Sequence, residues 1–203
     1  MLETLLAVCK AGASFDQRGW MLATAGNLSV RDTKDAAHYY VSASGLQKGD
    51  LHPTQDFVRM GLGMRTPPVH PKVSAETIVH DQLYAAFDGI ASIQHVHAPR
   101  MTLISRVIGA GNIWEIEGLE YIKALGFWGE GDIVRIPVVL NHHHIPDLAE
   151  AVVAAAHKDT RVPGVLVEGH GVYAWGDSVA AARRHVEAIE FLADICWEER
   201  FRS

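Results

Sequence analysis

The sequence lacks the features that mark several classes of protein. Only two of its 203 residues are cysteines, Cys9 and Cys196, which excludes a scaffold held by disulfide bonds. No apolar run approaches the roughly 18 residues that a membrane-spanning helix needs. Basic residues are outnumbered, with 18 Lys and Arg against 24 Asp and Glu, and this net charge of −6 argues against a nucleic-acid-binding protein.

Several catalytic and targeting patterns are also missing. The chain has no Gly-x-Ser-x-Gly elbow and no His-Glu-x-x-His motif, so neither a serine hydrolase nor a zincin protease is indicated. Its start, Met1-Leu-Glu-Thr, places an acid where a signal peptide carries basic residues. We therefore expect a soluble, cytoplasmic protein.

What the chain does have is the composition of a folded domain. Hydrophobic residues make up 48 % and charged residues 21 %, which is ordinary for a globular protein. At about 150 residues per domain, the length favours a single domain over residues 1–203. Twelve histidines are the one unusual count.

Helical and strand patterns alternate along the chain and predict an α/β fold with a mixed or mostly antiparallel sheet. Helices are expected at residues 2–20, 74–87, from 99, 118–125, 146–157 and 178–200, and strands at 26–31, 38–42, 56–60, 91–97, 132–140, 164–168 and 171–175. Ser74 is expected to cap its helix, and Pro137 to mark an edge strand or a bulge. Residues 61–71, with three prolines, are predicted to form an internal loop.

Two histidines on one predicted strand are the first candidate site. Because side chains at i and i+2 share a face, His95 and His97 can reach one metal ion. A zinc site needs a further protein ligand, and His170, between two glycines, is the best candidate. The simpler interpretation is a pair of buried, hydrogen-bonded histidines.

A rival cluster is the run His142, His143 and His144. Three consecutive residues of an extended chain cannot all face one ion. We therefore interpret the run as a solvated loop, with a place at the rim of a pocket as the alternative.

Two turns near the start are rich in hydrogen-bond donors. Residues 24–27 and 42–50 combine glycine backbone, hydroxyls, an amide and a lysine, which suits a phosphate group. Neither turn matches a P-loop or a Gly-x-Gly-x-x-Gly fingerprint, so a nucleotide is not indicated. Each is equally explained as a simple turn.

Carboxylates near the proposed metal residues are candidates for acid–base chemistry. Glu76 follows Ser74 at a predicted helix start, while Glu115, Glu117 and Glu120 come after the histidine strand. A carboxylate in a desolvated pocket can act as a general acid or base. Spacing alone does not choose among them.

Taken in order, five segments make the sequence resemble the class II aldolase and adducin family over nearly its whole length. They are Gly26-Asn-Leu-Ser29, Ser44-Gly-Leu-Gln-Lys-Gly-Asp50, Ser74-Ala-Glu76, His95-Val-His97 and Gly169-His-Gly171. The resemblance implies a three-layer α/β/α fold with a central, mainly antiparallel sheet. It also implies a zinc ion held by His95, His97 and His170, and a homotetramer with active sites near subunit interfaces.

Within the family, the chain resembles most the dehydratase branch. Three segments carry this likeness: Ser42-Ala-Ser-Gly-Leu-Gln-Lys48, Leu119-Glu-Tyr-Ile-Lys123 and Gly169-His-Gly-Val-Tyr-Ala-Trp-Gly176. The likeness implies dehydration of 5-methylthioribulose 1-phosphate in methionine salvage. It places the substrate phosphate on Gly26, Asn27, Ser44 and Gly45, with Thr24, Lys48 and Ser74 nearby.

The resemblance leaves two glutamates as catalytic candidates. The catalytic glutamate of the dehydratase branch corresponds to Glu120 in this sequence, and that of the sugar-phosphate aldolase branch corresponds to Glu76. We favour Glu120, because the residues around it match the dehydratases. The aldolase branch also uses a tyrosine near the C-terminus, whereas the last tyrosine here is Tyr173. A fuculose- or rhamnulose-phosphate aldolase, a ribulose-phosphate epimerase and a non-catalytic member of the family are the alternatives.

Overall fold

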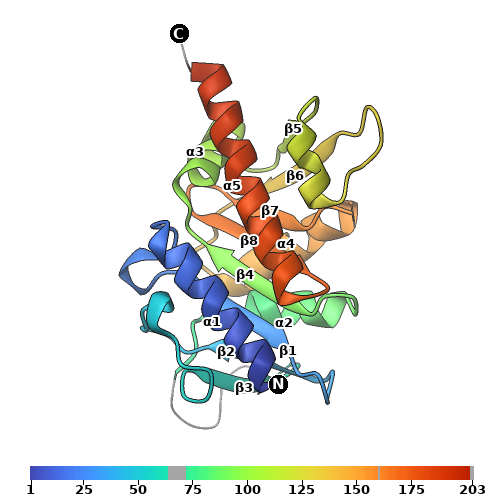
Figure 1. Ribbon diagram of the computed structural model, residues 1–203. Coiled ribbons are helices and arrows are strands. Elements are labelled where there is room, and N and C mark those ends of the chain that lie inside the picture. Colours follow the sequence, from blue (N-terminus) through green and yellow to red (C-terminus); the bar gives the residue numbers. More distant parts are fainter. Residues whose placement is uncertain (64–71, 160, 202–203) are drawn as a thin grey trace.

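The computed structural model describes residues 1–63, 72–159 and 161–201 (Figure 1). The strands are β1 (Asn27–Arg31), β2 (His38–Ser42), β3 (Phe57–Gly61), β4 (Ser92–Val96), β5 (Ile113–Ile116), β6 (Val134–Val139), β7 (Gly164–Val167) and β8 (Gly171–Gly176). The α-helices are α1 (Leu2–Gln17), α2 (Thr77–Ala86), α3 (Pro99–Ile108), α4 (Ile145–Lys158) and α5 (Val179–Phe201). Three short 3-10 helices are η1 (Leu22–Thr24), η2 (Lys48–Asp50) and η3 (Glu120–Leu125).

The strands form one sheet in the order β3-β2-β1-β4-β8-β7-β6-β5. Every neighbouring pair is antiparallel except β6 and β7, which confirms the prediction of a mainly antiparallel sheet. β4 lies in the middle, where His95 pairs with Asn27 of β1 on one side and with Tyr173 of β8 on the other. This register brings three segments that are distant in the sequence together around His95.

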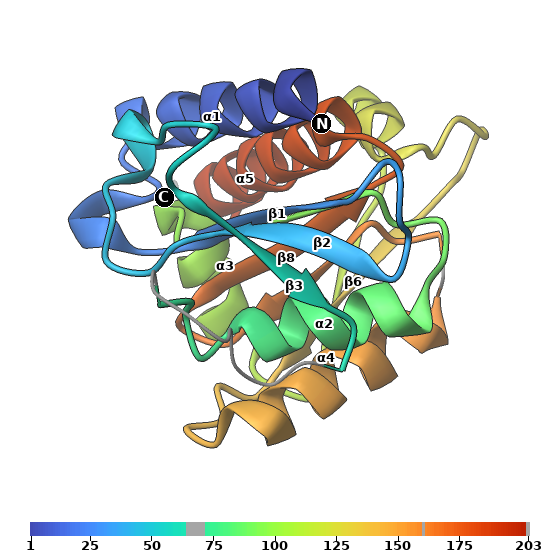
Figure 2. The ribbon, with the colours of Figure 1, turned by 90° about the horizontal axis from the view of Figure 1, so that it is seen from below.

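Helices cover both faces of the sheet, so the expected three-layer α/β/α arrangement is confirmed (Figure 2). One apolar core joins α1, α3 and α5 to the sheet, and a second joins α2 and α4 to its other face. Strand alternation divides the side chains between them: in β4, Val96 faces the first core and Ile93 the second. His95, two residues after Ile93, therefore points to the α2 and α4 side.

Of the two alternatives predicted for Pro137, an edge strand or a bulge, the edge strand is wrong. β6 lies between β5 and β7, and its pairing with β5 is regular as far as Pro137 itself. The Val138 N–H donates to the Asn112 carbonyl on the β5 side, so the Pro137 nitrogen points toward β7. Pairing with β7 begins only at Val138, and the missing N–H of proline therefore breaks no ladder bond.

The expected cap at Ser74 is also wrong. α2 begins at Thr77 with Glu76 in the N-cap position, and the Ser74 hydroxyl instead accepts the Glu76 N–H at 3.2 Å. This local bond forms a turn before the helix and orients Glu76. Of the loop predicted at residues 61–71, residues 64–71 lie outside the described part. None of the described helices is both long and apolar enough to cross a membrane.

Candidate metal centre

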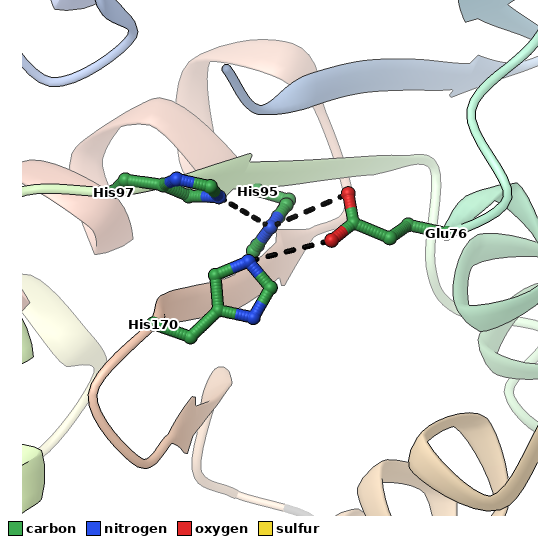
Figure 3. A group of neighbouring side chains, drawn as sticks. All are labelled: Glu76, His95, His97 and His170. Atoms are coloured by element: carbon green, nitrogen blue, oxygen red, sulfur yellow. Dashed lines mark hydrogen bonds and ion pairs between the residues drawn. The ribbon is translucent and has the colours of Figure 1, made fainter. Parts of the chain in front are cut away.

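Four side chains from three separate parts of the chain meet at one end of the sheet (Figure 3). They are His95 on β4, His97 just after it, His170 on the turn between β7 and β8, and Glu76 before α2. One ligand atom from each lies within 4.8 Å of all the others. His97 Nε2 is 3.0 Å from His95 Nε2, and Glu76 Oε1 is 3.3 Å from His170 Nε2. The three histidines that the sequence analysis singled out are thus neighbours, with Glu76 as a fourth member.

The backbone can approach this closely because glycine occupies two positions where no side chain fits. A Cβ atom on Gly171 would lie 2.1 Å from the Val96 carbonyl oxygen. Gly26 has a φ of +72°, and a Cβ there would lie 2.5 Å from the His95 carbonyl oxygen. Larger residues at either position would push β1 or β8 away from the histidine strand.

Hydrogen bonds orient two of the imidazole rings. His95 Nδ1 donates to the Val172 carbonyl at 2.9 Å, and His170 Nδ1 donates to the Asn141 side-chain oxygen at 3.3 Å. Because each of these oxygens can only accept, Nδ1 of each ring carries the hydrogen-bonded proton, which leaves Nε2 as the atom that would bind a metal. Nε2 of both rings faces the cluster, as metal-binding histidines require. Sequence reasoning missed Asn141, whose only signal is its place beside the 142–144 run.

Burial and close contact shift the pKa values of three cluster residues, His95, His97 and Glu76. Burial lowers the pKa of His97 to about 4 and holds that of His95 well below its ordinary value. Burial alone raises the pKa of Glu76, but a hydrogen bond from protonated His170 and the positive charge that the three rings carry when protonated lower it by more. Three imidazole nitrogens and one carboxylate oxygen are ligands that suit a divalent metal such as zinc. The residues present therefore fit a metal ion.

A cavity of about 360 Å³ adjoins the cluster, and Glu76 and His97 form part of its wall. All seven residues predicted to hold the substrate phosphate line the same cavity. They are Thr24, Gly26, Asn27, Ser44, Gly45, Lys48 and Ser74. The two donor-rich turns and the histidine cluster thus border one space.

Lys48 ties the two turns of this cavity together. Its side chain is buried, and Nζ donates to the carbonyls of Thr24 at 3.0 Å and Leu46 at 2.8 Å. Thr24 and Ala23 both have a left-handed φ, of 64° and 55°, which is strained for residues with a side chain. The lysine therefore holds a strained loop in place, a contact that its place in the sequence did not reveal.

Glu120 lies away from the metal cluster in the folded chain. η3 packs against α5, with the Tyr121 and Phe191 rings 4.4 Å apart, on the face of the sheet opposite α2. The Glu120 side chain is 85 % exposed and pairs with Lys123 at 2.6 Å. It lines a separate cavity of about 580 Å³ that contains none of the four cluster residues. Of the two predicted catalytic glutamates, only Glu76 is at the cluster within one chain.

The 142–144 histidine run occupies the connection between β6 and α4. His143 is exposed, and His144 Nδ1 pairs with Asp147 at 2.8 Å. Among the described residues, none of the three belongs to a group that could hold a metal. The neighbouring Ile145 lines the cavity, so the run lies near its rim.

Comparison with known proteins supplies the family. Residues 6–197 match the Class II Aldolase and Adducin N-terminal domain. A methylthioribulose-1-phosphate dehydratase from Leptospira biflexa is 35 % identical, covering 96 % of this chain and 97 % of that protein. One from Yersinia pestis is 39 % identical, covering 94 % and 83 %.

Solved structures share the fold. An L-fuculose-1-phosphate aldolase from Thermus thermophilus superposes with a TM-score of 0.78 at 24 % identity, over 100 % of this chain and 98 % of that one. YgbL from Klebsiella pneumoniae gives 0.81 at 22 % identity, over 99 % and 91 %. At these identities the likeness carries the fold alone, and the family follows from the sequence match: the chain belongs to the class II aldolase and adducin family.

Proposed function

We propose that this protein dehydrates 5-methylthioribulose 1-phosphate to 5-methylthio-2,3-dioxopentyl phosphate, as a cytoplasmic step of methionine salvage. One observation carries the proposal: the histidine and glutamate cluster borders the cavity of the seven predicted phosphate residues. Relatives at 35 % and 39 % identity over nearly the whole chain are named as dehydratases for this substrate. We take residues 1–203 as a single class II aldolase-like domain.

The proposed metal is zinc, held by His95, His97 and His170, with Glu76 beside it. When bound, zinc acts as a Lewis acid that stabilises negative charge developing on the substrate ketone. The His170 N–H donates to the Val167 carbonyl at 3.1 Å, and the strand that carries His95 pairs with β1 and β8. The site residues therefore need little rearrangement to accept the ion.

The cavity positions the substrate for the reaction. The phosphate would rest on Gly26, Ser44 and Gly45, while Lys48 keeps the two turns in place. The chemistry then needs a base to remove the proton from C3, and an acid to protonate the C4 hydroxyl, which leaves as water. The resulting enol becomes the 2,3-diketone by taking a proton at C4.

We assign these proton transfers to Glu120, acting in the site of a neighbouring subunit. Its exposed side chain is free to meet another chain, and Trp128, 71 % exposed, lies in the wall of the same cavity. A site shared between subunits is consistent with the expected homotetramer. Glu76 stays at the cluster, where its charge complements the metal.

Subunit mixing tests this assignment. His95→Ala and Glu120→Gln are each expected to inactivate the homo-oligomer. Oligomers assembled from both variants are expected to recover activity, because some sites then combine the intact histidines of one subunit with the intact Glu120 of its neighbour. Recovery excludes a site made by one chain. If Glu120→Gln retains near-normal turnover with zinc bound, Glu76 is the acid–base group instead.

Product analysis tests the function itself. Zinc-loaded protein is incubated with 5-methylthioribulose 1-phosphate, and mass spectrometry follows the phosphorylated products. We expect the loss of one water and the formation of a diketone phosphate. Release of dihydroxyacetone phosphate would instead identify an aldolase, and an unchanged mass with altered stereochemistry would identify an epimerase. A metal-free purified protein that gains no activity when zinc is added would support a non-catalytic role.

A further inference from the structure

A chain of hydrogen bonds runs behind the cluster, from the second apolar core to Glu76. His80, on α2, is completely buried, with Nδ1 2.7 Å from Ser29 Oγ and Nε2 2.5 Å from Asn27 Oδ1. Asn27 Nδ2 then donates to Glu76 Oε2 at 2.9 Å. At the other end, Ser29 Oγ is 2.8 Å from the Tyr84 hydroxyl. None of these bonds to His80 was anticipated from the sequence.

The donors and acceptors of this chain fit together in only one direction. Glu76 is a carboxylate that can only accept, so the Asn27 amide must turn its N–H toward Glu76 and its oxygen toward His80. That oxygen requires a proton on His80 Nε2. Burial lowers the pKa of His80 to about 3, so the ring is neutral and its Nδ1 accepts from Ser29. Tyr84 in turn donates to Ser29.

We propose that His80 is a positioning residue: its Nε2–H fixes the Asn27 amide, which in turn holds the Glu76 carboxylate toward the three histidines. The role rests on the metal centre proposed above and extends it by one layer into the protein. Without the Nε2–H, the Asn27 amide is free to turn its oxygen toward Glu76. Two oxygens would then face each other, and the carboxylate would move out of place.

Three variants of His80 separate hydrogen bonding from packing. Gln places an N–H near the position of Nε2, Asn places one near Nδ1, and Phe fills the space without a donor. We expect His80→Phe and His80→Asn to lower zinc affinity by about 10–100-fold, the range usual for the loss of an outer partner of a metal site, because the Glu76 carboxylate beside the metal is then displaced. We expect His80→Gln to restore most of it. His185→Gln, which changes a partly buried histidine outside the cluster, serves as the control and should bind zinc as the unaltered protein does.

Zinc affinity is measured by competition with a chromophoric chelator, together with the unfolding of the metal-free proteins. Unchanged affinity in His80→Phe and His80→Asn overturns the proposal, and so does a Gln variant that is as weak as Phe at equal stability. These measurements use no substrate, so they test the role of His80 even if the proposed reaction is wrong.

If the variants do not fold, nitrogen NMR of histidine-labelled unaltered protein gives the answer. Long-range proton–nitrogen couplings assign the proton of the neutral His80 ring to one of its two nitrogens. We expect the Nε2–H form, and an Nδ1–H form would overturn the proposal.

Discussion

The ring of His170 faces Asn141 through its Nδ1–H, 3.3 Å from the amide oxygen, and this bond aims the opposite nitrogen at Glu76. The two residues come from different connections, His170 from the turn after β7 and Asn141 from the segment after β6. β6 and β7 are the one parallel pair in the sheet, so both segments leave the sheet at the same end. The parallel pairing of β6 and β7 therefore brings Asn141 and His170 together at the site.

Loss of the Asn141 side chain should weaken the metal centre. We expect Asn141→Ala to lower zinc affinity by about 10–100-fold, because the His170 ring is then free to turn. His143→Ala, an exposed histidine two residues away, is the control and should bind zinc normally. Equal affinities in the two variants would show that Asn141 does not orient His170.

The phosphate pocket should act mainly in substrate binding. Ser44 lies in a donor-rich turn beside the cluster, and we expect Ser44→Ala to raise KM more than it lowers kcat. Lys48→Met should have a wider effect, because Lys48 bonds two backbone carbonyls as well as lining the cavity. We expect it to raise KM and lower the unfolding midpoint together. A loss confined to kcat in Ser44→Ala would contradict the phosphate assignment.

A buried carboxylate on α5 stabilises the helix that follows the histidine strand. Ala98, in the N-cap position of α3, offers no side-chain cap, and Glu190 instead accepts the N–H groups of Arg100 at 3.0 Å and Met101 at 2.8 Å. We expect Glu190→Ala to cost about 1–3 kcal/mol in the free energy of unfolding, measured by urea denaturation.

Glu187, one turn earlier on α5, provides the comparison for Glu190. It pairs at the surface with Arg18 at 3.3 Å and with Arg183 at 3.0 Å. Glu187→Ala should cost less than about 1 kcal/mol, as surface ion pairs usually do. A larger loss in Glu187→Ala than in Glu190→Ala would contradict the capping role.

Acid should destabilise the fold through His80. Burial lowers the pKa of His80 from 6.5 to about 3, so the unfolded chain binds the proton first as pH falls. Stability from this group is complete above about pH 6.5 and is lost progressively down to about pH 3. Between pH 7 and 5 the loss amounts to about 2 kcal/mol.

This pH dependence is measured on metal-free protein by urea denaturation at the two pH values. His95 and His97 contribute with the same sign, because burial lowers their pKa as well. The His80 part is the difference from His80→Gln, whose stability should fall by about 2 kcal/mol less over that range. Equal pH dependence in the two proteins would contradict a buried neutral His80.

Sequence reasoning reached the parts of the site that depend on local geometry. The two-residue period of a strand was enough to put His95 and His97 on one face. Glycines on both sides indicated His170 as a third ligand, Glu76 was one of four candidate carboxylates, and the two donor-rich turns suggested a phosphate site. The resemblance to the family joined these into one site, and the structure places them around one end of the sheet.

The rest of the site depends on contacts between distant segments, which no local pattern encodes. His80 looks like an ordinary residue of an amphipathic helix until β1 packs beside it and brings Ser29 and Asn27 within reach. The edge-strand prediction at Pro137 failed for a similar reason. β6 is an interior strand, but the Pro137 nitrogen points toward β7 before the pairing of β6 with β7 begins at Val138. The place of Glu120 depends on how η3 packs against α5.

The measurement that tests the account most directly is a crystal structure of the zinc-loaded protein, with anomalous scattering recorded at the zinc edge. We predict one anomalous peak per chain, within bonding distance of Nε2 of His95, His97 and His170. A peak at the 142–144 histidines, or no peak with zinc in excess, would contradict the metal centre.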